Sequence, residues 1–269
     1  MHYDRGPGRY VRRLSERPLP DGVLGNDVIG MFESATLIRS FVPAGQAGRD
    51  FHTHEVDQLY FILEGELEVV IGARTVTGRP HELIVIPAGL PHRNFNRADE
   101  DEIHLEIILP TPPPWPSWVQ EAERNEAQTE IELVRGETPE NLVTYKPNPG
   151  YRSNILADRK SGFGSGHLRI DRLDPGSSGP GMHIHRFDQF YFVLEGQLSV
   201  EVAGERHEVA RHELAVLNAG VPHRQWNGSG AQVKWLTMNL PEPGPGVRWD
   251  APVSVFEGDF SYELVAGEL

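Results

Sequence analysis

The chain contains 269 residues, with 25 basic and 39 acidic side chains, a net charge of −14 and no cysteine. The absence of cysteine excludes disulfides, thiolate metal sites and a thiol nucleophile, and the acidic charge argues against nucleic acid or an anionic membrane surface as a partner. No apolar run approaches the roughly 20 residues of a membrane span, and the first residues lack the apolar stretch of a secretion signal. We therefore expect a cytoplasmic protein with neither nucleic acid nor membrane as a partner.

Short apolar segments bounded by glycine and proline predict β-strands in both halves of the chain. In the first half, the segment 58–71 has apolar residues on both sides of a Glu-Gly turn, and residues 83–87 and 103–109 form two further short strands. The second half repeats the pattern, with predicted strands at 189–202, 214–217 and 233–240. Strands at this spacing indicate an all-β fold, with a sandwich or small barrel in each half.

A proline-rich segment, residues 111–116, separates the two halves and is expected to be stiff and extended. The segment from Ser117 to Gln128 contains good helix formers behind a serine able to cap them, which predicts a helix. We place the domain boundary here, with residues 1–114 as the N-terminal domain and residues 115–269 as the C-terminal domain.

The two halves are copies of one another. When His52 is aligned with His183, residues 52–110 match residues 183–241 without a gap, and roughly two in five of the aligned residues are identical. A period this long indicates duplication of a domain, because the repeats of solenoid proteins span only about 20–50 residues.

Three histidines and one glutamine recur with the same spacing in each copy. They are His52, His54, Gln58 and His92 in the first copy and His183, His185, Gln189 and His223 in the second. Residues of even spacing share one face of a strand, so the first three of each set are expected to point the same way. Three imidazole nitrogens and an amide oxygen suit Fe(II), Mn(II), Ni(II), Co(II) or Zn(II). All six histidines are kept between the diverged copies, so we expect metal binding; the alternative is that one site is structural or empty.

These residues resemble the two motifs of the cupin superfamily. The first motif is matched by Gly45, His52-x-His54, Gln58 and Gly65, the second by Pro87-x-Gly89, His92 and Asn96, and the second copy repeats both. The resemblance covers roughly residues 35–110 and 165–240. It implies a bicupin, with two tandem double-stranded β-helix (jelly-roll) barrels and one divalent transition metal per cupin domain, Fe(II) being favoured. The fold hosts many reactions, so the resemblance does not specify one.

The sequence departs from the cupin pattern at one ligand position in both copies. Gln58 and Gln189 stand where the family has a glutamate, and Asn218 replaces the proline of the second motif in the second copy. A divalent metal held by three neutral histidines and a glutamine keeps a net charge of +2 instead of +1. Such a centre is a stronger Lewis acid, favours M(II) over M(III), and suits an anionic ligand such as an enolate, carboxylate or catecholate.

Other polar residues recur beside the predicted ligands. Tyr60 and Tyr191 share the strand face of the glutamines, and we expect them to act on the substrate; the alternative is that they only fill the core. Asp57 and Asp188 face the other way. We expect these aspartates to pair with Arg93 and Arg224, the alternative being that they orient a ligand.

Three further features complete the comparison of the copies. His81-Glu82 and His212-Glu213 are expected to lie in turns, and Asn96 and Asn227 to brace the backbone. The second pocket is expected to be more aromatic and the first more polar, because His104 is replaced by Trp235.

Together these observations predict a bicupin metal-dependent enzyme that acts on a small oxygenated organic molecule. The favoured reaction is that of a dioxygenase, with O2 as co-substrate. Two alternatives remain: a non-redox metal-dependent isomerase, cyclase or lyase, and a non-catalytic binding protein that retains its metal. Against the dioxygenase stands the glutamine ligand, since some cupin dioxygenases are thought to use a ligand carboxylate as a base. The family resemblance also implies a homodimer.

Overall fold

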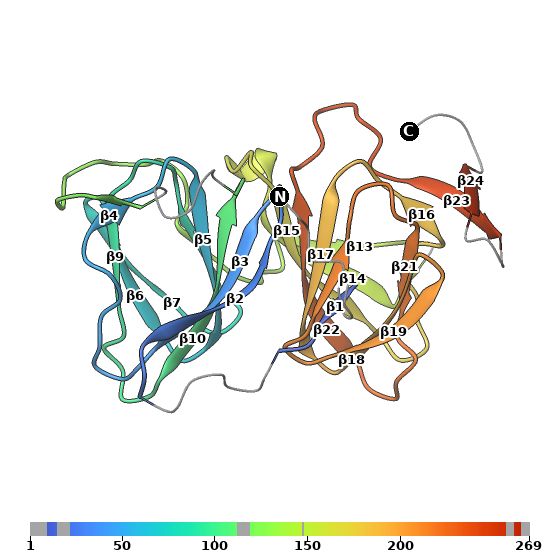
Figure 1. Ribbon diagram of the computed structural model, residues 1–269, viewed down its shortest axis with the longest axis horizontal. Coiled ribbons are helices and arrows are strands. Elements are labelled where there is room, and N and C mark those ends of the chain that lie inside the picture. The colour runs from blue at the N-terminus through green and yellow to red at the C-terminus, as the bar shows by residue number, and fades with distance from the viewer. Residues whose placement is uncertain (1–9, 15–21, 112–118, 147, 257–260, 265–269) are drawn as a thin grey trace. The chain divides into compact units, whose positions relative to one another are not determined.

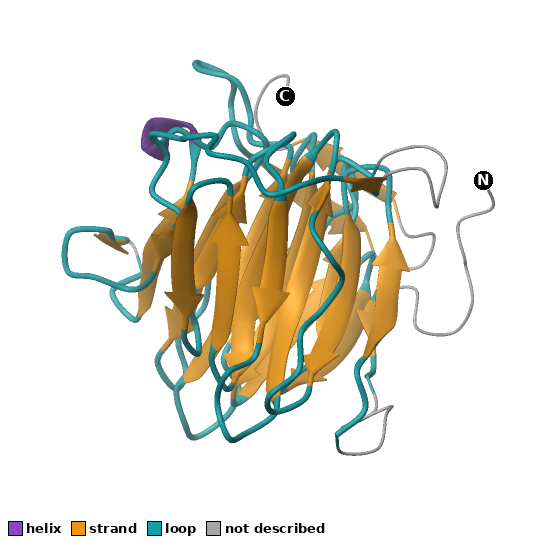
Figure 2. Ribbon diagram, turned by 90° about the vertical axis from the view of Figure 1, so that its left-hand side faces the viewer, coloured by secondary structure: helices purple, strands orange, loops and turns teal. Residues whose placement is uncertain are grey.

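The computed structural model describes residues 10–14, 22–111, 119–146, 148–256 and 261–264. The regular secondary structure of these residues is almost entirely β-strand, as Figure 2 shows, and the helix that they contain is the short 3-10 helix η1 (Arg159–Ser161). None of their helices has the length and apolar character needed to cross a membrane. The prediction of an all-β fold is therefore confirmed.

The chain folds into two compact units. The N-terminal unit comprises residues 17–137 and 160–165, and the C-terminal unit comprises residues 1–16, 138–159 and 166–269. The predicted domain boundary between residues 114 and 115 lies outside the described residues.

The N-terminal unit is a pair of antiparallel sheets, seen in Figure 1. One sheet has the order β12-β8-β5-β10-β3-β2 and the other the order β11-β4-β9-β6-β7. The strands of the first sheet are β2 (Gly25–Met31), β3 (Thr36–Val42), β5 (Asp57–Glu64), β8 (Leu83–Ile86), β10 (Glu102–Leu109) and β12 (Val134–Arg135). Those of the second are β4 (His52–Thr53), β6 (Leu67–Ile71), β7 (Arg74–Gly78), β9 (His92–Phe95) and β11 (Gln120–Glu121).

The C-terminal unit repeats this arrangement with additional strands. Its sheets have the orders β1-β20-β17-β22-β15-β14-β13 and β19-β18-β21-β16-β23-β24. The first contains β1 (Val11–Arg12), β13 (Leu142–Thr144), β14 (Tyr151–Ala157), β15 (His167–Leu173), β17 (Asp188–Glu195), β20 (Leu214–Leu217) and β22 (Val233–Leu240). The second contains β16 (His183–Ile184), β18 (Gln197–Val202), β19 (Glu205–Ala210), β21 (His223–Trp226), β23 (Ala251–Phe256) and β24 (Ser261–Leu264). All six strand segments predicted from the sequence are confirmed.

A hydrophobic core joins the two sheets of each unit. In the N-terminal unit, Tyr60 and Ile62 of β5 pack in one cluster with Leu67 and Val69 of β6. Alternate residues of a strand face one side, so each of these pairs points into the space between the sheets. Two sheets packed over such a core form a jelly roll, as the family resemblance implies, although neither sheet closes into a barrel.

The turn between the two central strands of each unit requires glycine. Gly65 has φ +74°, and a Cβ atom there would lie 2.7 Å from the carbonyl oxygen of Asp101. Its counterpart Gly196 has φ +77°, and its Cβ would lie 3.0 Å from the carbonyl oxygen of Gln232. The Glu-Gly turns of the two copies are thus fixed by backbone conformation and by lack of space.

Each unit has an equivalent edge strand supplied by a distant Val-Arg pair. In the N-terminal unit Val134 and Arg135 pair with β8, where Val134 lies opposite Ile84. In the C-terminal unit Val11 and Arg12 pair with β20, where Val11 lies opposite Ala215, the counterpart of Ile84. Each sheet thus closes its edge with a segment that lies outside the duplicated residues 52–110 and 183–241.

The helix predicted from Ser117 to Gln128 is wrong for residues 119–128, the part that the structure describes. Gln120 and Glu121 form β11 and pair with β4, and the carbonyl of Ala127 accepts a hydrogen bond from the backbone N–H of Ala73 at 3.1 Å. Local helix propensity is a weak preference, and a short helix without an apolar face gains little from packing. Pairing with the sheet edge prevails here.

Candidate metal centres

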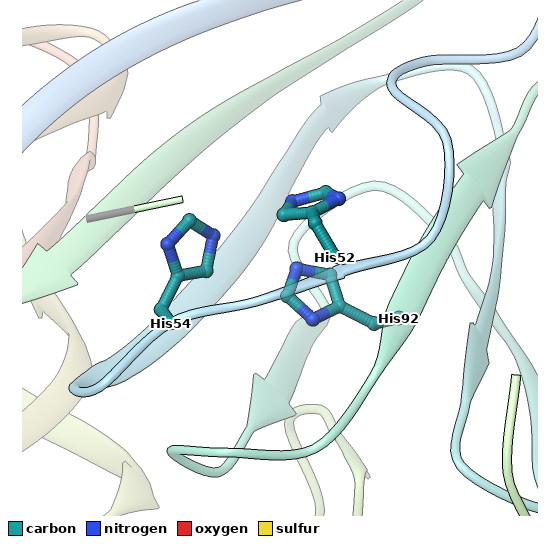
Figure 3. A group of neighbouring side chains, drawn as sticks. All are labelled: His52, His54 and His92. Atoms are coloured by element: carbon teal, nitrogen blue, oxygen red, sulfur yellow. The ribbon is translucent and has the colours of Figure 1, made fainter. Parts of the chain in front are cut away.

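Three histidines of the N-terminal unit turn their rings toward one another, as Figure 3 shows. His52 of β4 lies opposite His92 of β9 in the strand register, and His54 follows β4. One ligand nitrogen from each ring lies within 4.8 Å of the others. The Nδ1–H groups of His52 and His92 donate to the carbonyls of Asp50 (2.8 Å) and Leu90 (3.0 Å). In these two rings the unprotonated nitrogen is therefore Nε2, the atom left to bind a metal.

The C-terminal unit reproduces this geometry. His183 of β16 lies opposite His223 of β21, and the ligand nitrogens of these residues and His185 also lie within 4.8 Å of one another. All three Nδ1–H groups donate to backbone carbonyls. These are the carbonyls of Gly181, Phe187 and Val221, at 2.7, 2.7 and 2.9 Å. The structure thus brings together all six histidines predicted from the sequence as two groups of three.

Burial lowers the pKa and so favours the neutral form of His52, His92, His183, His185 and His223. It lowers the pKa of His52 to about 4, that of His92 to about 3 and that of His185 to about 4. Burial also lowers the pKa of His223 well below its ordinary value. Among the described residues, Nε2 of His92 and Nε2 of His223 have no hydrogen-bond partner although both atoms are buried. A buried neutral imidazole with a free lone pair fits a divalent metal.

The two glutamines lie beside the histidines, each with its amide NH2 anchored. Gln58 Nε2 donates to Glu106 Oε1 at 2.5 Å, and Gln189 Nε2 donates to Asn239 Oδ1 at 2.7 Å. Oε1 of Gln58 is buried without a partner among the described residues, while Oε1 of Gln189 lies 3.4 Å from Nε2 of His185. The amide oxygens are therefore the atoms presented to the histidine groups. In the N-terminal unit a carboxylate stands directly behind the amide, and in the C-terminal unit a neutral amide does.

A cavity adjoins each histidine group. The N-terminal cavity of about 500 Å³ is lined by Tyr60, His104 and Glu106 besides the histidines His52 and His54. The C-terminal cavity has about 550 Å³, and its lining includes Tyr151, Arg169, Tyr191 and Trp249. The first cavity has the more polar lining and the second the more aromatic one, as the sequence predicts, but Trp235, on which that prediction depends, is not among the residues that line the second. Both have the size of small-molecule sites.

The sequence profile of the cupin domain matches residues 39–108 and 169–239, which together make up more than half of the chain. The chain belongs to the cupin family. With one matched domain in each unit it is a bicupin, as the sequence resemblance implies.

Solved structures of other bicupin-like chains share this fold. A variant of oxalate decarboxylase from Bacillus subtilis superposes with a TM-score of 0.62 at 13% identity, covering 78% of this chain and 70% of that one. A variant of salicylate 1,2-dioxygenase from Pseudoaminobacter salicylatoxidans gives 0.59 at 13% identity, covering 77% and 72%. AerE from Microcystis aeruginosa gives 0.65 at 16% identity, covering 87% and 99%. A comparison with curated protein sequences finds no significant match.

The two recurring aspartates of the cupin domains brace turns. Asp57 accepts the backbone N–H of Ala88 at 2.9 Å and the hydroxyl of Ser165, and Asp188 accepts the backbone N–H of Ala219 at 3.0 Å. Arg93 pairs instead with Asp50, so the predicted pairing of Asp57 with Arg93 is wrong. Asp57 belongs to β5 of one sheet and Arg93 to β9 of the other, and the Asp57 carboxylate contacts the turn at Ala88 instead.

In the C-terminal cupin the other predicted partner, Arg224, pairs with Glu201 across the sheet at 2.7 Å. Asn96 and Asn227 brace the backbone as expected, each with an amide that donates to two carbonyls. His81 and His212 lie in turns with φ +68° and +62°, which confirms the turn prediction.

The tyrosines predicted to act on substrate line the two cupin cavities. Tyr60 and Tyr191 are both buried and also belong to the hydrophobic cores. Burial raises the pKa of each hydroxyl above its ordinary value. Each therefore remains a hydrogen-bond donor at neutral pH, and its role in a reaction stays a prediction.

Sequence reasoning missed an arginine in the C-terminal cupin cavity. Nε of Arg169 donates to both oxygens of Asp171 at 2.9 Å, and Nη2 donates to the hydroxyl of Tyr151 at 3.3 Å. Asp171 also accepts from Ser153 and Thr237. Burial alone would lower the pKa of Arg169, but the Asp171 carboxylate raises it above its ordinary value. The polar residues at alternating positions in the segment 167–173 could have indicated a buried arginine–carboxylate pair, but this segment lies outside the aligned repeat.

Proposed function

We propose that this bicupin is a metal-dependent enzyme that acts on a small oxygenated organic anion. In this proposal His52, His54, Gln58 and His92 hold one divalent metal, and the second cupin holds another through its counterparts His183, His185, Gln189 and His223. Fe(II) is the favoured metal, with Mn, Ni, Co and Zn as alternatives. The observation that carries the proposal is the convergence of neutral imidazoles and an amide oxygen on a cavity in each cupin.

Arg169 supports an anionic substrate. Asp171 and Tyr151 hold Nε and Nη2 of its guanidinium, and Nη1 has no partner among the described residues. An arginine fixed in this way can donate to a carboxylate or enolate oxygen that enters the C-terminal cavity. The neutral ligand set adds positive charge on the metal side of the same cavity, and together they favour an anion over a neutral or cationic molecule.

We propose O2-dependent cleavage of the substrate, the reaction of a dioxygenase, as the activity. A bound divalent metal supplies Lewis acidity and, in the case of Fe(II), the one-electron chemistry that O2 requires. The chain supplies the rest. The histidine Nδ1–carbonyl hydrogen bonds orient the ligand rings, Arg169 positions the anion, and Tyr60 and Tyr191 donate hydrogen bonds to substrate oxygens. The same fold is used by a salicylate 1,2-dioxygenase, so the scaffold is compatible with this chemistry.

The test begins with metal content. Protein refed separately with Fe(II), Mn(II), Ni(II), Co(II) and Zn(II) is expected to bind about one ion per cupin. His52→Ala and His183→Ala are each expected to remove about one ion per chain and leave the other. Anaerobic Fe(II) loading, followed by O2 uptake against diketones, flavonols and catechols, then tests the activity. Metal uptake well below one ion per chain under all conditions would refute the proposal.

A non-redox isomerase, cyclase or lyase is the second candidate, and the glutamine ligands favour it. Without a ligand carboxylate, the centre stabilises M(II) and acts as a stronger Lewis acid toward a carbonyl. Turnover with Zn(II) that is indifferent to O2 would decide for this candidate. Turnover that requires Fe(II) and consumes O2 would decide for the dioxygenase.

A further inference from the structure

A buried carboxylate–imidazole pair lies in the N-terminal cupin apart from the proposed metal ligands. Nδ1–H of His104 donates to Glu102 at 2.9 Å (Oε2) and 3.1 Å (Oε1). Both residues belong to β10, two positions apart, and both side chains are almost wholly inaccessible to solvent. Glu106 follows on the same strand, two positions further along. β10 therefore carries three ionisable side chains at alternate positions.

The imidazole of this pair faces the site. His104 lines the same cavity as His52, His54 and Gln58, and its ring lies 4.5 Å from the ring of Tyr60. Because Nδ1 carries the proton shared with Glu102, Nε2 carries the lone pair and lies on the ring edge turned away from the carboxylate. The hydrogen bonds given for the His104 ring within the described part of the chain are those of Nδ1 with Glu102. A proton acceptor thus lies on the side of the ring away from Glu102, in a residue that lines the cavity.

The surroundings make this imidazole a stronger base. Burial alone would lower the pKa of His104, but the charge of Glu102, its hydrogen bond and the charge of Glu106 together raise it. Of the neighbouring strands, β5 contributes the phenol of Tyr60, and the residue opposite His104 on β3 is the uncharged Ser40. A histidine whose pKa is raised above its ordinary value is a stronger base and takes up a proton more readily.

The C-terminal cupin shows that neither the fold nor the histidine group requires this pair. The counterparts of Glu102 and His104 are Val233 and Trp235, both completely buried. A buried ionic pair generally adds no stability over apolar residues of similar size. The N-terminal cupin thus keeps a pair that the fold does not need for stability, beside a centre whose proposed ligand set contains no carboxylate to act as a base.

We propose that His104, held by Glu102, is the base that deprotonates the substrate in the N-terminal cupin. The inference rests on the proposed function and assigns the substrate class: molecules with an acidic O–H group, such as an enol, enediol or catechol. The O–H bond breaks, and its electron pair stays on the oxygen, which becomes an anionic donor. The proton forms an N–H bond at Nε2, and Glu102 stabilises the resulting imidazolium. No oxidant is needed for this step, so it precedes either redox or non-redox chemistry.

The test uses 4-nitrocatechol, whose visible spectrum reports how many protons it has lost. Zn(II)-loaded protein is titrated anaerobically in a His183→Ala background, where only the N-terminal centre holds metal. The parent is expected to bind the probe as the dianion near neutral pH. His104→Gln is expected to bind it about 10-fold or more weakly, with the monoanion spectrum. The matched control, Trp235→Phe at the equivalent C-terminal position, is expected to leave affinity and spectrum unchanged.

Glu102→Gln provides two further readouts, and the first needs neither metal nor probe. NMR titration of the His104 ring in the metal-free protein is expected to give a lower pKa in Glu102→Gln than in the parent. In the zinc-loaded protein, Glu102→Gln is expected to shift the pH midpoint of probe ionisation upward, because the weaker base requires a higher pH.

The possible failures are distinguishable. If the parent takes up neither zinc nor any of the other four metals, the proposed function fails together with this inference. If His104→Gln binds zinc and gives the parent's probe spectrum and affinity, only the role of His104 is refuted. Zinc content also serves as the folding control, because a misfolded His104→Gln variant would not bind zinc. In that case the pH midpoint of probe ionisation in Glu102→Gln, which keeps the imidazole, tests whether His104 is the base.

Discussion

Exchanging the two proposed ligand glutamines for glutamate should separate the metal centres. Nε2 of Gln58 lies 2.5 Å from a carboxylate oxygen of Glu106, whereas Nε2 of Gln189 lies 2.7 Å from the amide oxygen of Asn239. Gln58→Glu therefore brings two carboxylates into contact. Gln189→Glu places its carboxylate beside an amide that can turn and donate instead.

The magnitude follows from these contacts. Two negative charges 2.5 Å apart repel by about 7 kcal/mol at an effective dielectric constant of 20. This repulsion offsets the attraction that a new carboxylate gains toward a divalent cation. We expect Gln189→Glu to raise the Zn(II) affinity of the C-terminal centre about 10-fold or more, equivalent to ~1.4 kcal/mol. Gln58→Glu should give no gain, and Gln58→Glu combined with Glu106→Gln should restore it.

Isothermal titration with Zn(II) measures these affinities one centre at a time. His183→Ala isolates the N-terminal centre and His52→Ala isolates the C-terminal one. An equal gain in Gln58→Glu and Gln189→Glu would refute the role assigned to Glu106. Unchanged affinity in both would show that the glutamines do not contact the metal.

Three further outcomes are expected. Gly65→Ala should lower the free energy of unfolding by about 2–3 kcal/mol, because φ is positive and a Cβ would lie 2.7 Å from a carbonyl oxygen. Gly89 has φ +77° but no atom within 4 Å of a Cβ, so Gly89→Ala should lower it by only about 1 kcal/mol. Urea unfolding measures both. Burial lowers the pKa of His52 to about 4, whereas the pKa of a histidine in the unfolded chain is ~6.5. Between these two pH values the unfolded state therefore binds more protons than the folded state. Metal-free protein should therefore lose stability as the pH falls from about 6.5 to about 4, by up to ~3 kcal/mol for this residue, and thermal melts of His52→Asn should show a shallower slope. Asp188→Ala should weaken Zn(II) binding about 10–100-fold by loosening the turn before His223, as measured by titration with the N-terminal centre removed.

The histidine groups could be predicted because their geometry follows from local rules. A His-x-His pair at the start of a strand and a histidine after a tight turn carry their spacing in the chain itself, and the duplication repeated it. The register of β4 with β9 then places His52 opposite His92. The same local character explains why the strands were identified correctly.

Features that depend on pairing between distant strands could not be predicted. Arg169 reaches the C-terminal cavity because β15 lies beside β22 in the sheet, and Asp171 holds it there. The meaning of His104 depended on its contact with Glu102, which the spacing alone left open. The predicted helix after residue 116 failed for a related reason, since a distant sheet edge at β4 outweighed local propensity.

The Val-Arg edge strands have a consequence for how this protein is built. The segments 10–12 and 133–135 pair with the equivalent strands β20 and β8. The carbonyl of Tyr10 accepts from the backbone N–H of Val216, and the carbonyl of Leu133 accepts from that of Val85, both at 2.8 Å. The segment at the start of the chain completes the C-terminal cupin, while the segment that follows the N-terminal cupin's repeat completes that cupin. The unit of duplication is therefore not the unit of folding: a gene cut midway would give one fragment carrying a strand it does not use and another lacking a strand it needs.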